Sequence, residues 1–143
     1  MSKSIVLDLF SGVGSFGIEC LSRGVEKVIF IENYKGVLPI LKKNLDNLKY
    51  KINFEIIKKN IYDNKTLSNL NTKFDIIFLD PPYKDKNIEK ILLNILINKS
   101  LKDDGIIIMH RHKNEKDYFP EKFEIIEEKN YGISKIIFLK LLN

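Results

Sequence analysis

The sequence predicts an α/β fold of the Rossmann-like type, a mostly parallel seven-stranded sheet with helices on both faces. Two observations carry this prediction. Short apolar runs rich in β-branched residues recur along the chain, as in strands that are buried on both faces. Amphipathic stretches with a helical period lie between these runs. Because strands and helices alternate, right-handed crossovers should place the strands parallel to one another in one sheet.

Five apolar runs have the composition of central strands. They lie at residues 4–8, 28–32, 53–57, 74–80 and 105–110. The helical stretches between them lie at residues 15–23, 36–48 and 87–99. Gly24 follows the first helix, where a left-handed residue commonly ends a helix, and Pro39 falls in or near the first turn of the second.

The C-terminal part of the chain breaks this alternation. Residues 123–129 and 134–142 both read as strands, and only Asn130-Tyr131-Gly132 and one further residue separate them. A link this short permits only an antiparallel hairpin. We therefore expect the sheet to end with one reversed strand.

Length and composition narrow the class of protein. A chain of 143 residues suits one domain, so we expect residues 1–143 to form a single unit. The only cysteine, Cys20, cannot form an intrachain disulfide, which favours a reducing compartment such as the cytoplasm. No apolar run approaches the roughly 20 residues that span a bilayer, and residues 1–10 lack the features of a secretory signal. We expect neither a membrane protein nor a disulfide scaffold.

The basic character of the chain is a weak clue to a partner. The formal net charge is +5, but only Arg23 and Arg111 among the 24 basic residues are arginine. Such a surface could attract phosphate groups. It could equally be a solvated lysine coat of the kind that an AT-rich genome encodes, and charge alone favours this second interpretation.

A glycine-rich loop follows the first strand. Gly12, Gly14 and Gly17 fit the pattern G-x-G-x-x-G, with a strand before them and a helix after them. Glycine lets the backbone turn sharply and approach a ligand closely. In a parallel sheet, ligands bind beyond the carboxyl ends of the strands, so the loop predicts a cofactor site there.

Two acidic residues distinguish between cofactors. Glu32 ends the second strand, where a carboxylate can accept hydrogen bonds from both ribose hydroxyls of a nucleoside. Asp8 lies beside the glycine loop, where it would repel a pyrophosphate but suit the amino or sulfonium group of S-adenosylmethionine. The sequence therefore favours S-adenosylmethionine over NAD, and the chemistry of S-adenosylmethionine needs no metal.

The segment Asp80-Pro81-Pro82-Tyr83 follows the fourth strand. The prolines end the strand, which leaves the Asp80 carboxylate and the Pro81 carbonyl free to accept hydrogen bonds. Tyr83 offers a flat face on which a planar group can stack. Two acceptors beside an aromatic ring suit the exocyclic amine of a nucleobase, which they would align for in-line attack on a methyl group.

Three segments carry a resemblance to a known family. VLDLFSGVGSFGIECLSRG, VIFIE and FDIIFLDPPY resemble class I S-adenosylmethionine-dependent methyltransferases that act on amino groups, and more narrowly the RsmD family. The resemblance implies the strand order 3-2-1-4-5-7-6 with strand 7 antiparallel. It also implies that the segment from Asp8 to Gly14 contacts the methionine part, Glu32 the ribose and Asn60 the adenine amine. The implied cofactor site comprises Asp8, Phe10, Gly12, Gly14, Glu32, Asn33, Asn60 and Asp80.

The RsmD family methylates the N2 amine of a guanine in 16S ribosomal RNA, so the resemblance implies this activity and a ribosomal RNA or small-subunit assembly particle as partner. Asp80 and the Pro81 carbonyl would hold the amine and Tyr83 would stack on the base, which must be single-stranded or flipped out. The product of the cofactor would be S-adenosylhomocysteine. Two alternatives stay open: an adenine-N6 DNA or RNA or glutamine-N5 protein methyltransferase, and a binding subunit that keeps the fold without turnover.

Two features stay open as well. Members of the RsmD family carry a few dozen residues before the glycine-loop strand, whereas this strand begins near residue 4 here. The expectation is a shortened version of the family or a protein partner that replaces the missing arm.

The segment His110-Arg111-His112 ends the fifth strand, where it could contact RNA phosphates or form a plain polar strand end.

Overall fold

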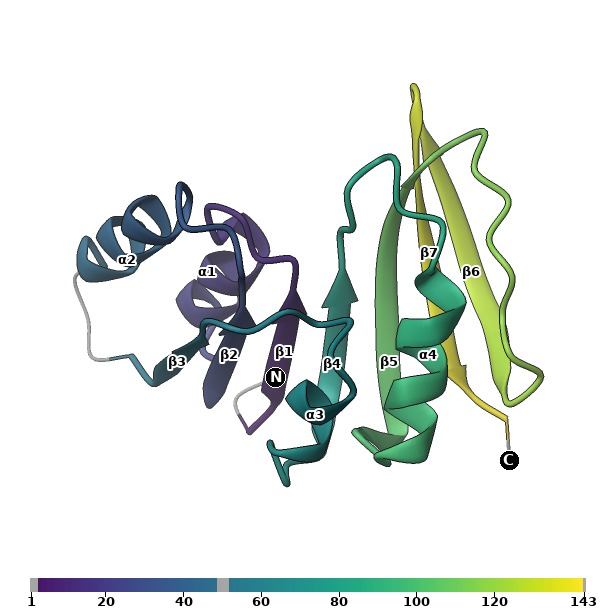
Figure 1. Ribbon diagram of the computed structural model, residues 1–143, viewed down its shortest axis with the longest axis horizontal. Coiled ribbons are helices and arrows are strands. Elements are labelled where there is room, and N and C mark those ends of the chain that lie inside the picture. The colour runs from purple at the N-terminus through teal and green to yellow at the C-terminus, as the bar shows by residue number, and fades with distance from the viewer. Residues whose placement is uncertain (1–2, 49–51, 143) are drawn as a thin grey trace.

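The computed structural model describes residues 3–48 and 52–142. The strands are β1 (Ile5–Leu9), β2 (Lys27–Ile31), β3 (Phe54–Ile57), β4 (Phe74–Leu79), β5 (Leu101–His112), β6 (Phe123–Tyr131) and β7 (Ser134–Leu141). The helices are α1 (Ser15–Ser22), α2 (Leu38–Asp46), α3 (Asn64–Ser68) and α4 (Ile88–Ile97). The strands form one sheet in the order β3-β2-β1-β4-β5-β7-β6 (Figure 1).

The predicted topology is confirmed. β1 to β5 pair in parallel, whereas β7 lies antiparallel between β5 and β6. In Figure 1 the strands β1, β4 and β5 point toward the same edge of the sheet, and the tip of the β6–β7 hairpin projects beyond that edge. The turns that follow the parallel strands therefore gather on one side of the molecule.

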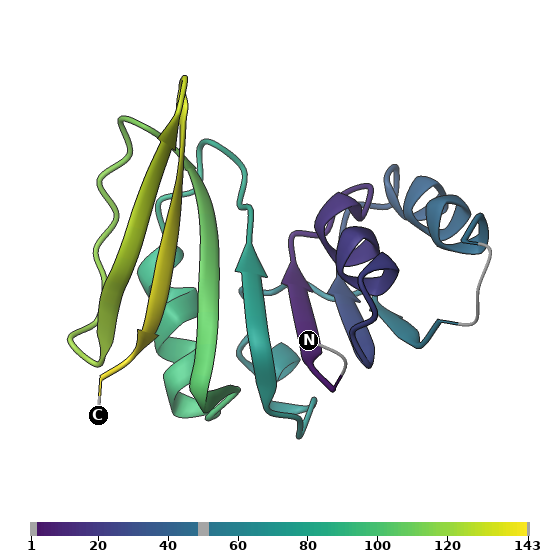
Figure 2. The same cartoon turned by 180° about the vertical axis from the view of Figure 1, so that it is seen from behind.

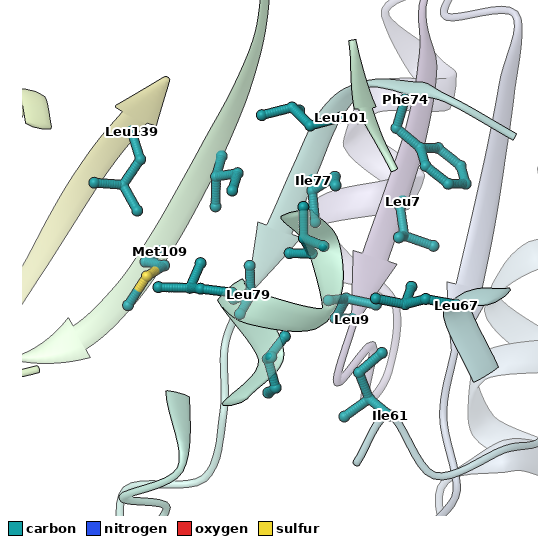
Figure 3. Packing of buried hydrophobic residues seen from close by; sticks show 14 of the residues in the cluster. Leu7, Leu9, Ile61, Leu67, Phe74, Ile77, Leu79, Leu101, Met109 and Leu139 are labelled. Atoms are coloured by element: carbon teal, nitrogen blue, oxygen red, sulfur yellow. The ribbon is translucent and has the colours of Figure 1, made fainter. Parts of the chain in front are cut away.

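The face of the sheet toward α3 and α4 carries the larger apolar cluster. Four side chains are fully buried there: Leu7 and Leu9 of β1 and Ile77 and Leu79 of β4. Figure 3 labels all four in the packed cluster. Burying each such side chain contributes roughly 1.5–3 kcal/mol. Because side chains alternate along a strand, Asp8 lies on the opposite face of β1.

The opposite face is covered by α1 and α2 over β1 to β3, where Val28, Phe30 and Leu41 are buried. A Cβ atom at Gly17 of α1 would lie 2.3 Å from the Phe30 ring, so only glycine allows this close packing. Within the described residues, no helix lies over β5 and β7 on this face (Figure 2). The half-buried side chains of Ile108 and Phe138 face that open region.

Several boundaries differ from the sequence-based prediction. β5 begins at Leu101 rather than at residue 105, because Leu101 pairs with Phe74 before a register shift. Helix α2 begins at Leu38 rather than at residue 36, with Pro39 in its first turn. The short helix α3 was not predicted, although Asp63 caps it by accepting a hydrogen bond from the Lys65 N–H.

The turn of the C-terminal hairpin begins two residues later than predicted and is shorter. β6 extends through Tyr131, so the turn consists of Gly132 and Ile133 rather than Asn130-Tyr131-Gly132. Gly132 has a φ of 56°, a backbone conformation that glycine adopts without strain at the first position of a two-residue hairpin turn.

None of the helices in the described ranges is long and apolar enough to cross a membrane.

Candidate active site

The glycine loop connects β1 to α1 and wraps around the Asp8 carboxylate. Gly14 precedes α1 with a φ of 87°, and Gly12 has a φ of 55°, so both adopt the left-handed conformation that glycine tolerates. The backbone N–H of Gly17 donates to Asp8 Oδ2 at 3.2 Å. The first turn of α1 thus holds one oxygen of a carboxylate that is almost completely buried.

Asp8 is electrostatically unusual. Among the described residues, its Oδ1 is buried without a hydrogen-bond partner. The pKa of Asp8 is raised from 3.8 to about 8, chiefly by burial; the hydrogen bond from Gly17 opposes this shift, and the nearby charges of Asp80 and Glu32 add to it. Three carboxylates around one region favour a cationic ligand, which would stabilise the ionised form of Asp8.

Replacing Asp8 with asparagine should remove a pH dependence of stability. Between about pH 4 and pH 8 the folded protein retains a proton that the unfolded chain releases, so the free energy of unfolding falls as pH rises through this window. The contribution is complete below pH 4 and is lost as pH approaches 8. Urea unfolding at pH 5 and pH 8 should show a steeper decline for the wild type than for Asp8→Asn. Parallel declines would contradict a raised pKa at Asp8.

Glu32 organises the turn after β2. Its Oε1 accepts from the Gly12 N–H at 2.7 Å, and its Oε2 accepts from the N–H groups of Asn33 at 3.0 Å and Tyr34 at 2.9 Å. These bonds fix the carboxylate and tie the glycine loop of β1 to the end of β2. Since each carboxylate oxygen has two lone-pair sites, acceptor capacity is left for a ligand hydroxyl.

Two cavities meet at Phe10 on the carboxyl edge of the sheet. One cavity of about 680 Å³ is lined by Asp8, Gly12 and Asp80 among others. The second, about 320 Å³, is lined by Glu32, Asn33, Asn60 and Tyr62 among others. Phe10 lines both cavities and has a φ of 57°, a strained conformation for a non-glycine residue and one that is common at binding sites.

Two residues of the motif after β4 line these cavities, Asp80 the larger and Pro82 the smaller. The Asp80 side chain is 49% exposed, and the Tyr83 ring is exposed as well. His110 Nδ1 lies 2.9 Å from Asp80 Oδ1. The ring of His112 meets the Tyr83 ring edge-on, with the centroids 5.5 Å apart.

Asn60 lies at the rim of the smaller cavity, after β3. Its Oδ1 accepts from the Tyr62 N–H at 2.9 Å, which orders the loop. The Tyr62 ring packs against Phe10, and its hydroxyl donates to the Asp85 carboxylate. Burial and the bond to Asp85 raise the pKa of Tyr62, so the phenol stays protonated and a donor.

Arg111 anchors the loop that carries the motif after β4. The Arg111 side chain is 1% exposed, and its Nε and one terminal nitrogen donate to the two Asp117 oxygens at 2.8 and 3.0 Å. The same terminal nitrogen donates to the Asp85 carbonyl at 2.9 Å. Asp85 is therefore held from two sides, through its backbone by Arg111 and through its side chain by Tyr62.

The structure brings the predicted site residues to one edge of the sheet. Asp8, Gly12 and Asp80 line one cavity and Glu32, Asn33 and Asn60 line its neighbour, with Phe10 between them. Gly14 begins the helix behind the loop, and the buried Pro81 and exposed Tyr83 lie after β4. The contributions of Tyr62 and Asp85 were not predicted, although a tyrosine two residues after Asn60 was an available signal.

The donor set fits S-adenosylmethionine. The buried, unpartnered Oδ1 of Asp8 calls for a positive charge, which the ammonium or sulfonium of this cofactor carries. Glu32 lines the adjoining cavity, where its oxygens suit ribose hydroxyls. Among residues 3–48 and 52–142, no group of three or more His, Cys, Asp or Glu side chains is placed to hold a metal ion.

Comparison with known proteins assigns the family. The family model described as "Conserved hypothetical protein 95" matches residues 1–140. Ribosomal RNA small subunit methyltransferase D of Haemophilus influenzae is 36% identical over 132 residues, which cover 92% of this chain and 68% of that relative.

Solved structures share the fold. The crystal structure of a "putative methylase" from Haemophilus influenzae superposes with a TM-score of 0.85 at 34% identity, covering 99% of this chain and 89% of that one. A "putative methyltransferase complexed with SAH" superposes with a TM-score of 0.79 at 17% identity, covering 98% of this chain and 46% of that one. The chain therefore belongs to the family described as Conserved hypothetical protein 95, the RsmD-like methyltransferases.

Proposed function

We propose that residues 1–143 form one methyltransferase domain that transfers a methyl group from S-adenosylmethionine to the N2 amine of a guanine in small-subunit ribosomal RNA. The observation that carries the proposal is the position of Asp80, the first residue of Asp80-Pro81-Pro82-Tyr83, in the cavity that contains Asp8 and the glycine loop. The name of the Haemophilus influenzae relative supports ribosomal RNA as the substrate class. A ribosomal substrate implies that the protein acts in the cytoplasm.

The cofactor would span the two adjoining cavities. Asp8 and the backbone of the loop from Phe10 to Gly14 would hold its methionine part, and Glu32 with Asn33 its ribose. Asn60 would contact the adenine. A protein with the same fold has been solved in complex with SAH, which supports a cofactor of this class. When bound, the cofactor supplies an electrophilic methyl group on a positively charged sulfur.

The residues after β4 would orient the target amine. Asp80 and the Pro81 carbonyl would each accept one of its N–H groups, which directs the nitrogen lone pair toward the methyl group. The exposed Tyr83 ring would stack on the guanine. Since the base must leave its stack to reach these groups, the substrate would present it single-stranded or flipped out.

The test is transfer of a labelled methyl group from S-adenosylmethionine to four substrates: unmethylated small-subunit particles, naked ribosomal RNA, DNA and protein. We expect label in the particle or in the RNA, and nuclease digestion should yield N2-methylguanosine. Label in N6-methyladenosine or in glutamine would replace the proposed substrate by one of the alternatives. Cofactor binding without transfer to any substrate would favour a binding subunit, and tighter binding of NAD would exclude methyl transfer.

A further inference from the structure

His110 directly contacts the carboxylate on which the proposed function depends. Its Nδ1 lies 2.9 Å from Asp80 Oδ1. An ionised carboxylate can only accept a hydrogen bond, so the imidazole donates its Nδ1–H. We infer that His110 is a positioning residue that holds the Asp80 carboxylate toward the target amine, an inference that rests on the proposed function.

The strand register brings the two residues together. Leu79 at the end of β4 pairs with Met109 of β5, so the next residues, Asp80 and His110, are neighbours across the two strands. Because side chains alternate along β5, His110 lies with Ile108 on the cavity face, and Met109 is buried on the other. Asp80 and His110 both line the 680 Å³ cavity with Asp8.

A positioning partner is needed because nothing in the strand itself fixes Asp80. β4 ends at Leu79, Pro81 follows, and the Asp80 side chain is half-exposed. An unrestrained carboxylate would sample several rotamers, whereas methyl transfer requires the reacting groups to be aligned within about 0.5 Å. The bond from His110 engages Oδ1 and leaves Oδ2 free to accept from an amine.

His112, two residues further along β5, makes a different set of contacts. Its Nδ1 accepts from the Asn114 N–H at 3.1 Å, and its ring meets Tyr83 edge-on. When neutral, His112 therefore carries its proton on Nε2, whereas His110 carries its proton on Nδ1. The two histidines thus differ in tautomer, and this difference is directly measurable.

Nitrogen-15 NMR of the imidazoles tests the contact without cofactor or RNA. The chain has two histidines, so His110→Asn assigns both sets of signals. At a pH where both rings are neutral, we expect His110 as the Nδ1–H tautomer and His112 as the Nε2–H tautomer. Asp80→Ala should move His110 toward Nε2–H and leave His112 unchanged. A wild-type His110 in the Nε2–H form would overturn the inference.

Steady-state kinetics of His110 variants test whether the contact with Asp80 contributes to methyl transfer. His110→Leu should lower kcat at least about tenfold, with little change in KM for RNA or in cofactor affinity. His110→Asn keeps an N–H near the position of Nδ1 and should retain kcat within about threefold of the wild type. Asp104→Asn, at an exposed site near the opposite end of β5, is the matched control and should behave as the wild type.

A failure of the role of His110 can be distinguished from a failure of the proposed function. His110→Leu with a wild-type kcat, or His110→Asn as impaired as His110→Leu, would overturn the role of His110 alone. A wild-type protein that binds cofactor but transfers no methyl group would overturn the proposed function and this inference together, even where the NMR signals show the contact with Asp80.

Discussion

Replacing Asp80 with alanine should abolish methyl transfer and leave the affinity for S-adenosylmethionine within roughly threefold of the wild type. The Asp80 carboxylate would contact the amine during the reaction, so its loss removes both an oriented acceptor and a charge that stabilises the developing ammonium. Losing one such group costs roughly 10²–10³-fold in kcat. The cofactor keeps the buried Asp8 and the Glu32 network, which do not depend on Asp80 for their hydrogen bonds.

Single-turnover transfer to the RNA substrate and calorimetry with the cofactor measure the two effects separately. Asp104→Ala removes an exposed carboxylate near the far end of β5 and serves as the control for loss of one negative charge. Equal losses of transfer and of cofactor affinity in Asp80→Ala would mean that Asp80 belongs to the cofactor site and does not hold the amine.

Much of the site could be predicted because its residues lie at the ends of individual strands or in the loops directly after them. Asp8 and the glycines lie in one loop, Glu32 ends the next strand, and parallel strands bring such ends to one edge. Asn60 required the family resemblance, since an asparagine in a polar loop has no distinctive pattern of its own. The contact between His110 and Asp80 depends on the register of β4 against β5, which the spacing of residues along the chain does not specify.

The boundary of β5 was misplaced for the same reason, since local sequence does not specify how strands pair. Residues 101–104 include three charged side chains, so their composition does not indicate a strand, yet Leu101 is buried and pairs with Phe74. Tertiary pairing overrides local preference there. The strand order was predictable from the resemblance, and the antiparallel hairpin from the shortness of its link alone.

Arg111 shows how an ambiguous sequence feature becomes clear in three dimensions. As one of two arginines in a lysine-rich chain, at the end of β5, it could have been an RNA contact. Its side chain instead points away from the cavity face occupied by His110 and is buried against Asp117. The planar guanidinium makes two bonds to Asp117 and reaches the Asp85 carbonyl, a geometry that a lysine cannot reproduce.

Replacing Arg111 with methionine should lower the free energy of unfolding by about 3–5 kcal/mol, because it leaves the buried Asp117 carboxylate without its counter-charge. Urea unfolding monitored by circular dichroism measures this loss. The matched control is Arg23→Met, which removes the other arginine from an exposed pair with Glu19 and should cost less than about 1 kcal/mol.

The double variant Arg111→Met with Asp117→Leu separates charge from packing. Replacing both members of a buried ion pair with apolar side chains is often close to neutral, so the double variant should regain much of the stability that Arg111→Met loses. It should not regain methyl transfer in full, because the Asp85 carbonyl still lacks its donor, which leaves the loop after Tyr83 with the Asp85–Tyr62 bond and the Lys86–Glu115 ion pair. If Arg111→Met is no less stable than Arg23→Met, the buried pair does not anchor this loop.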